Sequence, residues 1–187
     1  MAYRNGIYVA FAADGNTDVT KSDIKYYNLM KLWNLMKNRD FQFINPHEKG
    51  AMLRSGSKEL TIKKTLRDRL DNSKVMILLV GNTTKLDTDF VPYEIQYAIS
   101  SCDLPIIVCY VNERNRITTL QQRFKNLWPK VLADAINDGT THTIHIPFRQ
   151  RILNQALNQF NLSNRPTYHD GVYGDDTYNK LYNAGEI

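Results

Sequence analysis

Hydrophobic residues occur along the chain in blocks, and the spacing within each block distinguishes strands from helices. Residues 75–80 (VMILLV) and 105–111 (PIIVCYV) are apolar at nearly every position, as in strands of a parallel sheet that is covered on both faces. Shorter β-type runs occupy residues 7–11 (IYVAF), 41–45 (FQFIN) and 143–148 (TIHIPF), where β-branched and aromatic residues are enriched. The pattern therefore predicts five strands.

Between these runs the apolar positions recur at steps of three and four, which is the spacing of an amphipathic helix. In the helix predicted over 58–72, Ile62, Leu66 and Leu70 share one face. The other predicted helices span 23–37, 89–101 and 149–160, and residues 117–136 are largely helical with an interruption at Trp128-Pro129. The last residues, 162–187, are polar, glycine-containing and tyrosine-rich. They predict an irregular tail.

Strands that alternate with helices predict an α/β protein with an open, doubly wound, mainly parallel five-stranded sheet and helices on both faces. No repeat or linker divides the chain, so a single domain over residues 1–187 is expected. In such sheets ligands bind beyond the carboxyl ends of the strands, where the strand order reverses. The loops expected at this edge have the sequences AADGNTD, NPHEKG, GNTTKLDTD and NERNR.

Composition and charge narrow the function classes. The net charge of +5 permits an anionic partner such as a nucleotide, but the basic residues in 63–69 and 113–116 are interleaved with acids, so nucleic-acid binding is not favoured. No apolar run approaches the roughly 18 residues of a membrane helix, and the N-terminus lacks the apolar core of a signal peptide. Cys102 and Cys109 are expected to be core residues. We therefore expect a cytoplasmic protein without a membrane partner.

Several familiar sites are missing from the sequence. It has no GxGxxG after the first strand, no Walker loop and no GxSxG. The histidines at 47, 142, 145 and 169 do not have a metal-ligand spacing. A receiver domain would need an aspartate directly after residues 75–80, where Gly81-Asn82-Thr83 stands. No metal or bound cofactor is predicted.

The remaining candidate is Glu94, in the helix predicted over 89–101. At about 100° per residue, Glu94 lies about 60° from Val91, at the margin of the apolar stripe. Phe90, one turn earlier, can cover the same surface. An aromatic ring beside a carboxylate suits cleavage of an N-glycosidic bond, whose transition state resembles an oxocarbenium ion. The alternative is a glutamate that only stabilises the start of its helix. The other residues of the stripe are Ile95, Ala98, Ile99 and Cys102.

The segment 73–112 resembles bacterial TIR-like domains, specifically the group that includes the Thoeris anti-phage defence proteins. The resemblance rests on the turn Val80-Gly81-Asn82-Thr83, on the helix start Phe90-Val91-Pro92-Tyr93-Glu94-Ile95 and on the apolar strand that follows. The opening YVAFAADGNTD also fits the family's first strand and loop. The family's aromatic residue one turn before the glutamate is usually Trp, whereas this chain has Phe90.

The resemblance implies a flavodoxin-like three-layer fold, a role in signal transduction and, in enzymatic members, cleavage of NAD at the nicotinamide-ribose bond. NAD would be a substrate that is hydrolysed or cyclised. The family's catalytic glutamate matches Glu94. The implied substrate-binding residues are Phe11, Asp14, Asn16, His47, Asn82 and Phe90.

Two hypotheses follow from the resemblance. The chain is either such an enzyme, acting on NAD or a related nucleotide, or a non-catalytic adaptor. The adaptor would act by self-association or by binding another signalling protein.

Overall fold

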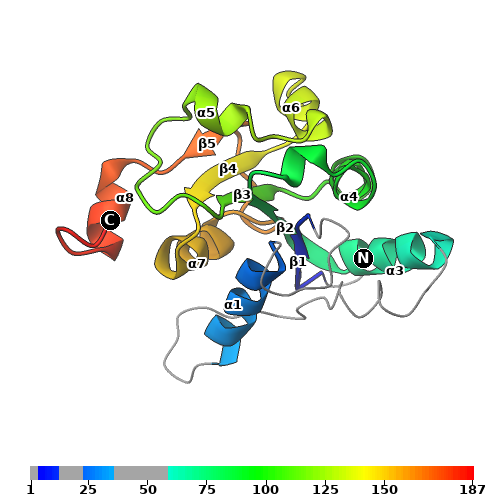
Figure 1. Cartoon of the computed structure of the whole chain (residues 1–187), viewed down its shortest axis with the longest axis horizontal. Coiled ribbons are helices and arrows are strands. Elements are labelled where there is room, and N and C mark those ends of the chain that lie inside the picture. The colour runs from blue at the N-terminus through cyan, green and yellow to red at the C-terminus, as the bar shows by residue number, and fades with distance from the viewer. Residues whose placement is uncertain (1–3, 13–22, 36–58) are drawn as a thin grey trace.

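The sheet is the centre of the fold. The computed structural model describes residues 4–12, 23–35 and 59–187. Within these residues five strands form one parallel sheet, in which neighbouring strands follow the order of the chain (Figure 1). The strands are β1 (Gly6–Ala10), β2 (Ser73–Val80), β3 (Ile106–Tyr110), β4 (Thr143–Pro147) and β5 (Gly171–Val172). The α/β class and the mainly parallel five-stranded sheet are confirmed.

Four of the five predicted strands are present as β1 to β4. The strand predicted at 41–45 lies outside the described residues, and β5 is a strand that was not predicted. Among the described strands the order does not reverse, so the predicted reversal that would mark a ligand site is not found within them. β5 has two residues, which is too short for any alternation to show in the sequence.

Helices cover both faces of this sheet, as predicted. One face is covered by α1 (Ile24–Leu35), α7 (Gln150–Gln159) and α8 (Asp175–Leu181) (Figure 1). The other face is covered by α3 (Glu59–Asp71), α4 (Phe90–Ser100), α5 (Gln122–Lys125) and α6 (Lys130–Asn137) (Figure 1). A 3-10 helix, η1 (Thr84–Leu86), precedes α4.

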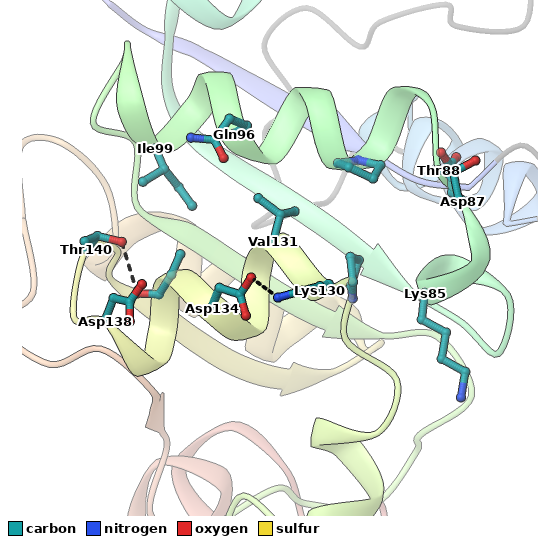
Figure 2. Close-up of a pocket in the computed structure, with 13 residues that line it drawn as sticks. Lys85, Asp87, Thr88, Gln96, Ile99, Lys130, Val131, Asp134, Asp138 and Thr140 are labelled. Atoms are coloured by element: carbon teal, nitrogen blue, oxygen red, sulfur yellow. Dashed lines mark hydrogen bonds and ion pairs between the residues drawn. The ribbon is translucent and has the colours of Figure 1, made fainter.

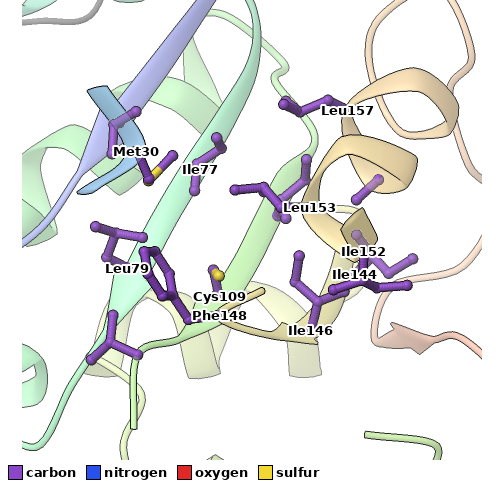
Figure 3. Close-up of a cluster of buried hydrophobic side chains, with 14 of the residues drawn as sticks. Met30, Ile77, Leu79, Cys109, Ile144, Ile146, Phe148, Ile152, Leu153 and Leu157 are labelled. Atoms are coloured by element: carbon purple, nitrogen blue, oxygen red, sulfur yellow. The ribbon is translucent and has the colours of Figure 1, made fainter. Parts of the chain in front are cut away.

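Each strand contributes alternate side chains to two separate cores. Ile77 and Leu79 of β2 pack under α1 and α7 (Figure 3), whereas Met76 and Leu78 pack under α3 and α4. This alternation follows from the period of two along a strand. Since both faces are covered, β2 reads as one continuous apolar run, and this is why the central strands were predictable.

The C-terminal segment is more ordered than its composition indicated. Residues 162–187 were expected to be irregular, but they contain β5 and α8. Tyr178 of α8 is fully buried, and its hydroxyl accepts a hydrogen bond of 3.3 Å from the amide of Ile117. Tyr178, Leu181 and Tyr182 of this segment pack on the core at steps of three and four, a helical spacing of a single turn within an otherwise polar segment.

No helix in the described parts of the chain is both long and apolar enough to cross a membrane. Cys102 and Cys109 are buried and unpaired core residues, as predicted. The predicted interruption near Pro129 is also present, because α5 ends at Lys125 and α6 begins at Lys130.

Candidate functional site

Glu94 points from α4 toward the sheet. It is the fifth residue of α4, so it lies beyond the first turn. Its side chain has no exposed surface, whereas the sequence placed it at the margin of the apolar stripe. The wheel was right about the stripe but could not show that β1 lies opposite this margin. The phenolic hydroxyl of Tyr8 in β1 donates a hydrogen bond of 2.7 Å to Oε1 of Glu94.

The start of α4 is fixed by Asp87. One carboxylate oxygen, Oδ1, accepts the backbone N–H groups of Asp89, Phe90 and Val91 at 3.0, 3.1 and 3.3 Å. These amides have no partner within the helix, so Asp87 supplies the missing acceptor. Its negative charge also interacts favourably with the positive end of the helix dipole. The register of α4, and with it the direction of Glu94, is therefore set at Asp87.

The turn after β2 is built around Gly81. Its N–H donates to Oγ1 of Thr84 at 2.7 Å, and that hydroxyl lies 3.3 Å from Oδ2 of Asp23 at the start of α1. A Cβ on residue 81 would lie 2.6 Å from Oδ1 of Asp23. Only glycine lets the carboxylate approach the backbone this closely. This explains the glycine of the Val80-Gly81-Asn82-Thr83 turn.

The polar group around Glu94 includes two residues that the sequence did not identify, Tyr8 and Arg69. Burial raises the pKa of Tyr8 well above its ordinary value, and the charge and hydrogen bond of Glu94 raise it further, whereas Arg69 lowers it. The Tyr8 phenol is therefore a permanent donor to Glu94. Nη1 of Arg69, on α3, is buried without a hydrogen-bond partner in the described part of the chain. A tyrosine within an otherwise apolar strand was the available signal for Tyr8.

Phe90 and Asn82, two further predicted site residues, lie in the segment that follows β2. Phe90 is half-buried and packs against the core cluster that contains Tyr8. Asn82, exposed at the carboxyl end of β2, accepts a hydrogen bond of 3.3 Å from Nδ2 of Asn112, which follows β3. The hydroxyl of Tyr26 on α1 donates to Oδ1 of Asn112 at 3.1 Å. A polar chain thus crosses the carboxyl edge of the sheet from α1 to β2.

Phe11 is in a different environment from Glu94. Its ring is buried and stacks on Tyr27 of α1, with 5.2 Å between the ring centres and 24° between their planes. It belongs to the core under α1 and α7, whereas Tyr8 belongs to the core under α3 and α4. The two predicted site residues Phe11 and Glu94 therefore do not share one core. Asp14, Asn16 and His47 lie outside the described residues.

A cavity of about 570 Å³ lies between α4 and α6 (Figure 2). Pro92, Gln96 and Ile99 of α4 line it, and an ion pair of 2.6 Å between Lys130 and Asp134 of α6 lies across from them (Figure 2). Glu94 is not among the lining residues. This cavity is therefore separate from the Glu94–Tyr8 pair. The described residues contain no group of three or more acidic, histidine or cysteine side chains arranged to hold a metal ion.

The comparison with known families matches the part of the chain that holds this site. The family model for the TIR-like domain of Thoeris protein ThsB matches residues 8–116, more than half of the 187 residues. The match includes Tyr8, Asn82 and Glu94, together with the strands β2 and β3. It supports a TIR-like role in signalling or defence. The chain belongs to the family of the Thoeris ThsB TIR-like domain.

Proposed function

We propose that this protein cleaves NAD at the bond between nicotinamide and ribose, with Glu94 as the catalytic residue, and that it does so in anti-phage defence. One observation carries the proposal: the Glu94 carboxylate is fully buried and is held by Tyr8 at 2.7 Å, two residues before the carboxyl end of β1. A carboxylate that only stabilised its helix would lie in the first turn and in solvent. Family membership supports the same residue.

The chemistry needs a negative charge at a fixed position. When the N-glycosidic bond breaks, positive charge develops on the ribose as in an oxocarbenium ion. A carboxylate removed from water stabilises such a charge more strongly than an exposed one, because the local dielectric is lower. Tyr8 holds one carboxylate oxygen of Glu94 in place. The orientation of Glu94 is therefore set before the substrate binds, which reduces the reorganisation needed during the reaction.

Phe90 supplies an apolar surface for the reacting part of the substrate. It lies one turn before Glu94 on α4, so both side chains emerge on the same side of the helix. The side chain of Glu94 is fully covered. NAD therefore reaches Glu94 only if its binding moves the groups that cover the carboxylate. Once the bond is broken, capture of the ribosyl cation by water gives hydrolysis, and capture by a nucleophile of the same molecule gives cyclisation.

A second function is favoured by the same burial. With no exposed surface and with a hydrogen bond from Tyr8, Glu94 also meets the requirements of a structural residue that joins α4 to β1. The protein would then be an adaptor that acts by self-association or by binding another signalling protein. In that case Glu94→Gln would lower stability without removing any chemistry.

The test is incubation of the purified full chain with NAD at high protein concentration, because neighbouring copies could complete the site. Nicotinamide release is followed by chromatography, and the second product separates hydrolysis from cyclisation. We expect release that increases with protein concentration and time. Absence of nicotinamide under conditions in which an active TIR enzyme turns over would favour the adaptor.

A further inference from the structure

A second cavity, of about 480 Å³, lies at the carboxyl end of β4 and the start of α7. None of the residues that line it lines the cavity between α4 and α6, and Glu94 is not among them. Its volume falls within the range of small-molecule sites, roughly 300 to 1,000 Å³. Of the described residues that line it, three are arginines: Arg114, Arg149 and Arg151.

The protein backbone fixes each arginine through one corner of its guanidinium group. Nη1 of Arg114 donates to the carbonyl of Phe148 at 3.1 Å, and Nε of Arg149 donates to the carbonyl of Arg114 at 2.9 Å. Nη1 of Arg151 donates to the carbonyl of Leu181 at 2.8 Å. A guanidinium has five N–H donors in a rigid plane. The three groups are thus positioned in advance and keep further donors for an anion.

The cavity already holds an anionic group from the C-terminal segment. Oε2 of Glu186 lies 3.1 Å from Nη1 of Arg151 and accepts the amide of Asn183 at 2.7 Å. This carboxylate compensates one of the three arginine charges. Glu113, next to Arg114 in the chain, pairs instead with Arg123 at 2.6 Å. Among the described residues that line the cavity, three arginines therefore face one acid, and one of these arginines already pairs with a carboxylate.

An aromatic surface lies beside the arginines. The indole of Trp33 on α1 stacks on the ring of Phe148, with 5.0 Å between ring centres and 27° between planes. Both residues line the cavity. Planar guanidinium groups bind phosphoryl oxygens in pairs, and an aromatic face stacks on a nucleobase. A ligand that carries both groups matches the cavity better than a free phosphate.

We propose that this cavity binds a nucleotide through its phosphate groups, and that Glu186 occupies the phosphate position in the free protein. The ligand class is a nucleoside diphosphate or a molecule that contains one. Arg149 and Arg114 receive the phosphate groups, Trp33 receives the base, and Glu186 leaves Arg151 when the ligand enters. The site is separate from Glu94 and does not depend on NAD cleavage.

The experiment is a calorimetric titration of the full chain with ADP, with adenosine and inorganic pyrophosphate as comparisons. ADP should bind more tightly than either. Glu186→Gln should tighten ADP binding several-fold, because the competing charge is removed while the side-chain shape is kept. Arg149→Ala should weaken binding about tenfold, the loss of one charge-assisted hydrogen bond. Quenching of tryptophan fluorescence by ADP, lost in Trp33→Phe, gives an independent readout.

The matched control is Asp134→Asn, which removes one negative charge from the ion pair on α6. It should leave ADP binding unchanged. Binding that is unaffected by both Glu186→Gln and Arg149→Ala would place the nucleotide elsewhere and overturn the proposal. The proposal would also be overturned if adenosine bound as tightly as ADP, or if ADP bound neither the natural chain nor Glu186→Gln. None of these outcomes depends on whether Glu94 is catalytic, since no turnover is measured.

Discussion

The hydroxyl of Tyr8 donates a hydrogen bond of 2.7 Å to Oε1 of Glu94, although the two residues are 86 positions apart in the chain. The bond joins the first strand to the helix that follows β2. It fixes the direction of a carboxylate that has no exposed surface. If Glu94 is catalytic, Tyr8 is its positioning residue.

Tyr8→Phe removes this hydrogen bond and keeps the ring. A hydrogen bond to a charged group contributes roughly 1.5 to 3 kcal/mol, so the rate of NAD cleavage should fall by about 10- to 100-fold. Thermal unfolding measured beside turnover separates a loss of stability from a loss of rate. A variant that is less stable but turns over NAD at the natural rate would remove Tyr8 from the catalytic account.

Asp87→Ala should destabilise the protein and disturb Glu94 through the start of α4. Loss of an N-terminal cap costs about 0.5 to 2 kcal/mol, and here one oxygen serves three backbone amides. Asp87→Asn keeps an acceptor oxygen and should lose less. The measurement is the free energy of unfolding in urea for both variants. Equal losses for Ala and Asn would contradict the role of the side-chain oxygen.

Gly81→Ala should destabilise the turn after β2, because the added Cβ would lie 2.6 Å from the buried carboxylate of Asp23. Overpacking of this kind costs about 1 to 3 kcal/mol. Gly174→Ala is the control, since a Cβ there meets no atom within 4 Å. Urea unfolding of the two variants compares them directly. A Gly81 variant as stable as the control would show that Asp23 moves aside without cost.

His145 should make stability depend on pH. Burial lowers the pKa of His145 to about 3, whereas in the unfolded chain it is about 6.5. Below about pH 6.5 the unfolded state binds the additional proton, so this contribution to stability is complete above about pH 6.5 and declines as the pH falls toward 3. The decline is at most about 1.4 kcal/mol per pH unit.

Burial is the main reason why His145 resists protonation, and its hydrogen bonds also fit the neutral ring. The indole of Trp128 donates to the Tyr110 oxygen at 2.8 Å, so the Tyr110 hydroxyl donates to Nδ1 of His145 at 2.9 Å. Nε2–H then donates to Oγ1 of Thr143, which donates to the carbonyl of His169. A proton on Nδ1 would break the bond from Tyr110. Unfolding free energies between pH 4 and 8 should show a smaller slope for His145→Gln than for the natural chain. Equal slopes in the two proteins would contradict this assignment.

The parts of the fold that the sequence predicted are those with local, periodic causes. Ile62, Leu66 and Leu70 are spaced by one turn, and all three are buried in α3. β2 is buried on both faces, so its apolar run predicted a strand without knowledge of its neighbours. The helix in the tail was not predicted, because its apolar spacing covers only one turn and its main contact, from Tyr178 to Ile117, spans 61 positions.

The site was predictable only in part, for the same reason. The helical wheel identified the face of α4 that carries Glu94 but not the strand opposite that face. The Tyr8 contact depends on the pairing of β1 with β2, and the separation of Phe11 from Tyr8 depends on which helices cover each face. Both features depend on how separate elements pack together, and the spacing of residues within one element does not predict this packing.

Catalysis by Glu94 is tested by comparing nicotinamide release by the natural chain, Glu94→Gln and the exposed-site control Glu59→Gln, each shown to be folded by thermal unfolding. We expect that Glu94→Gln keeps its fold and loses release by at least about a hundredfold, whereas Glu59→Gln releases nicotinamide like the natural chain. A folded Glu94→Gln variant that releases nicotinamide at the natural rate would contradict the catalytic role of Glu94.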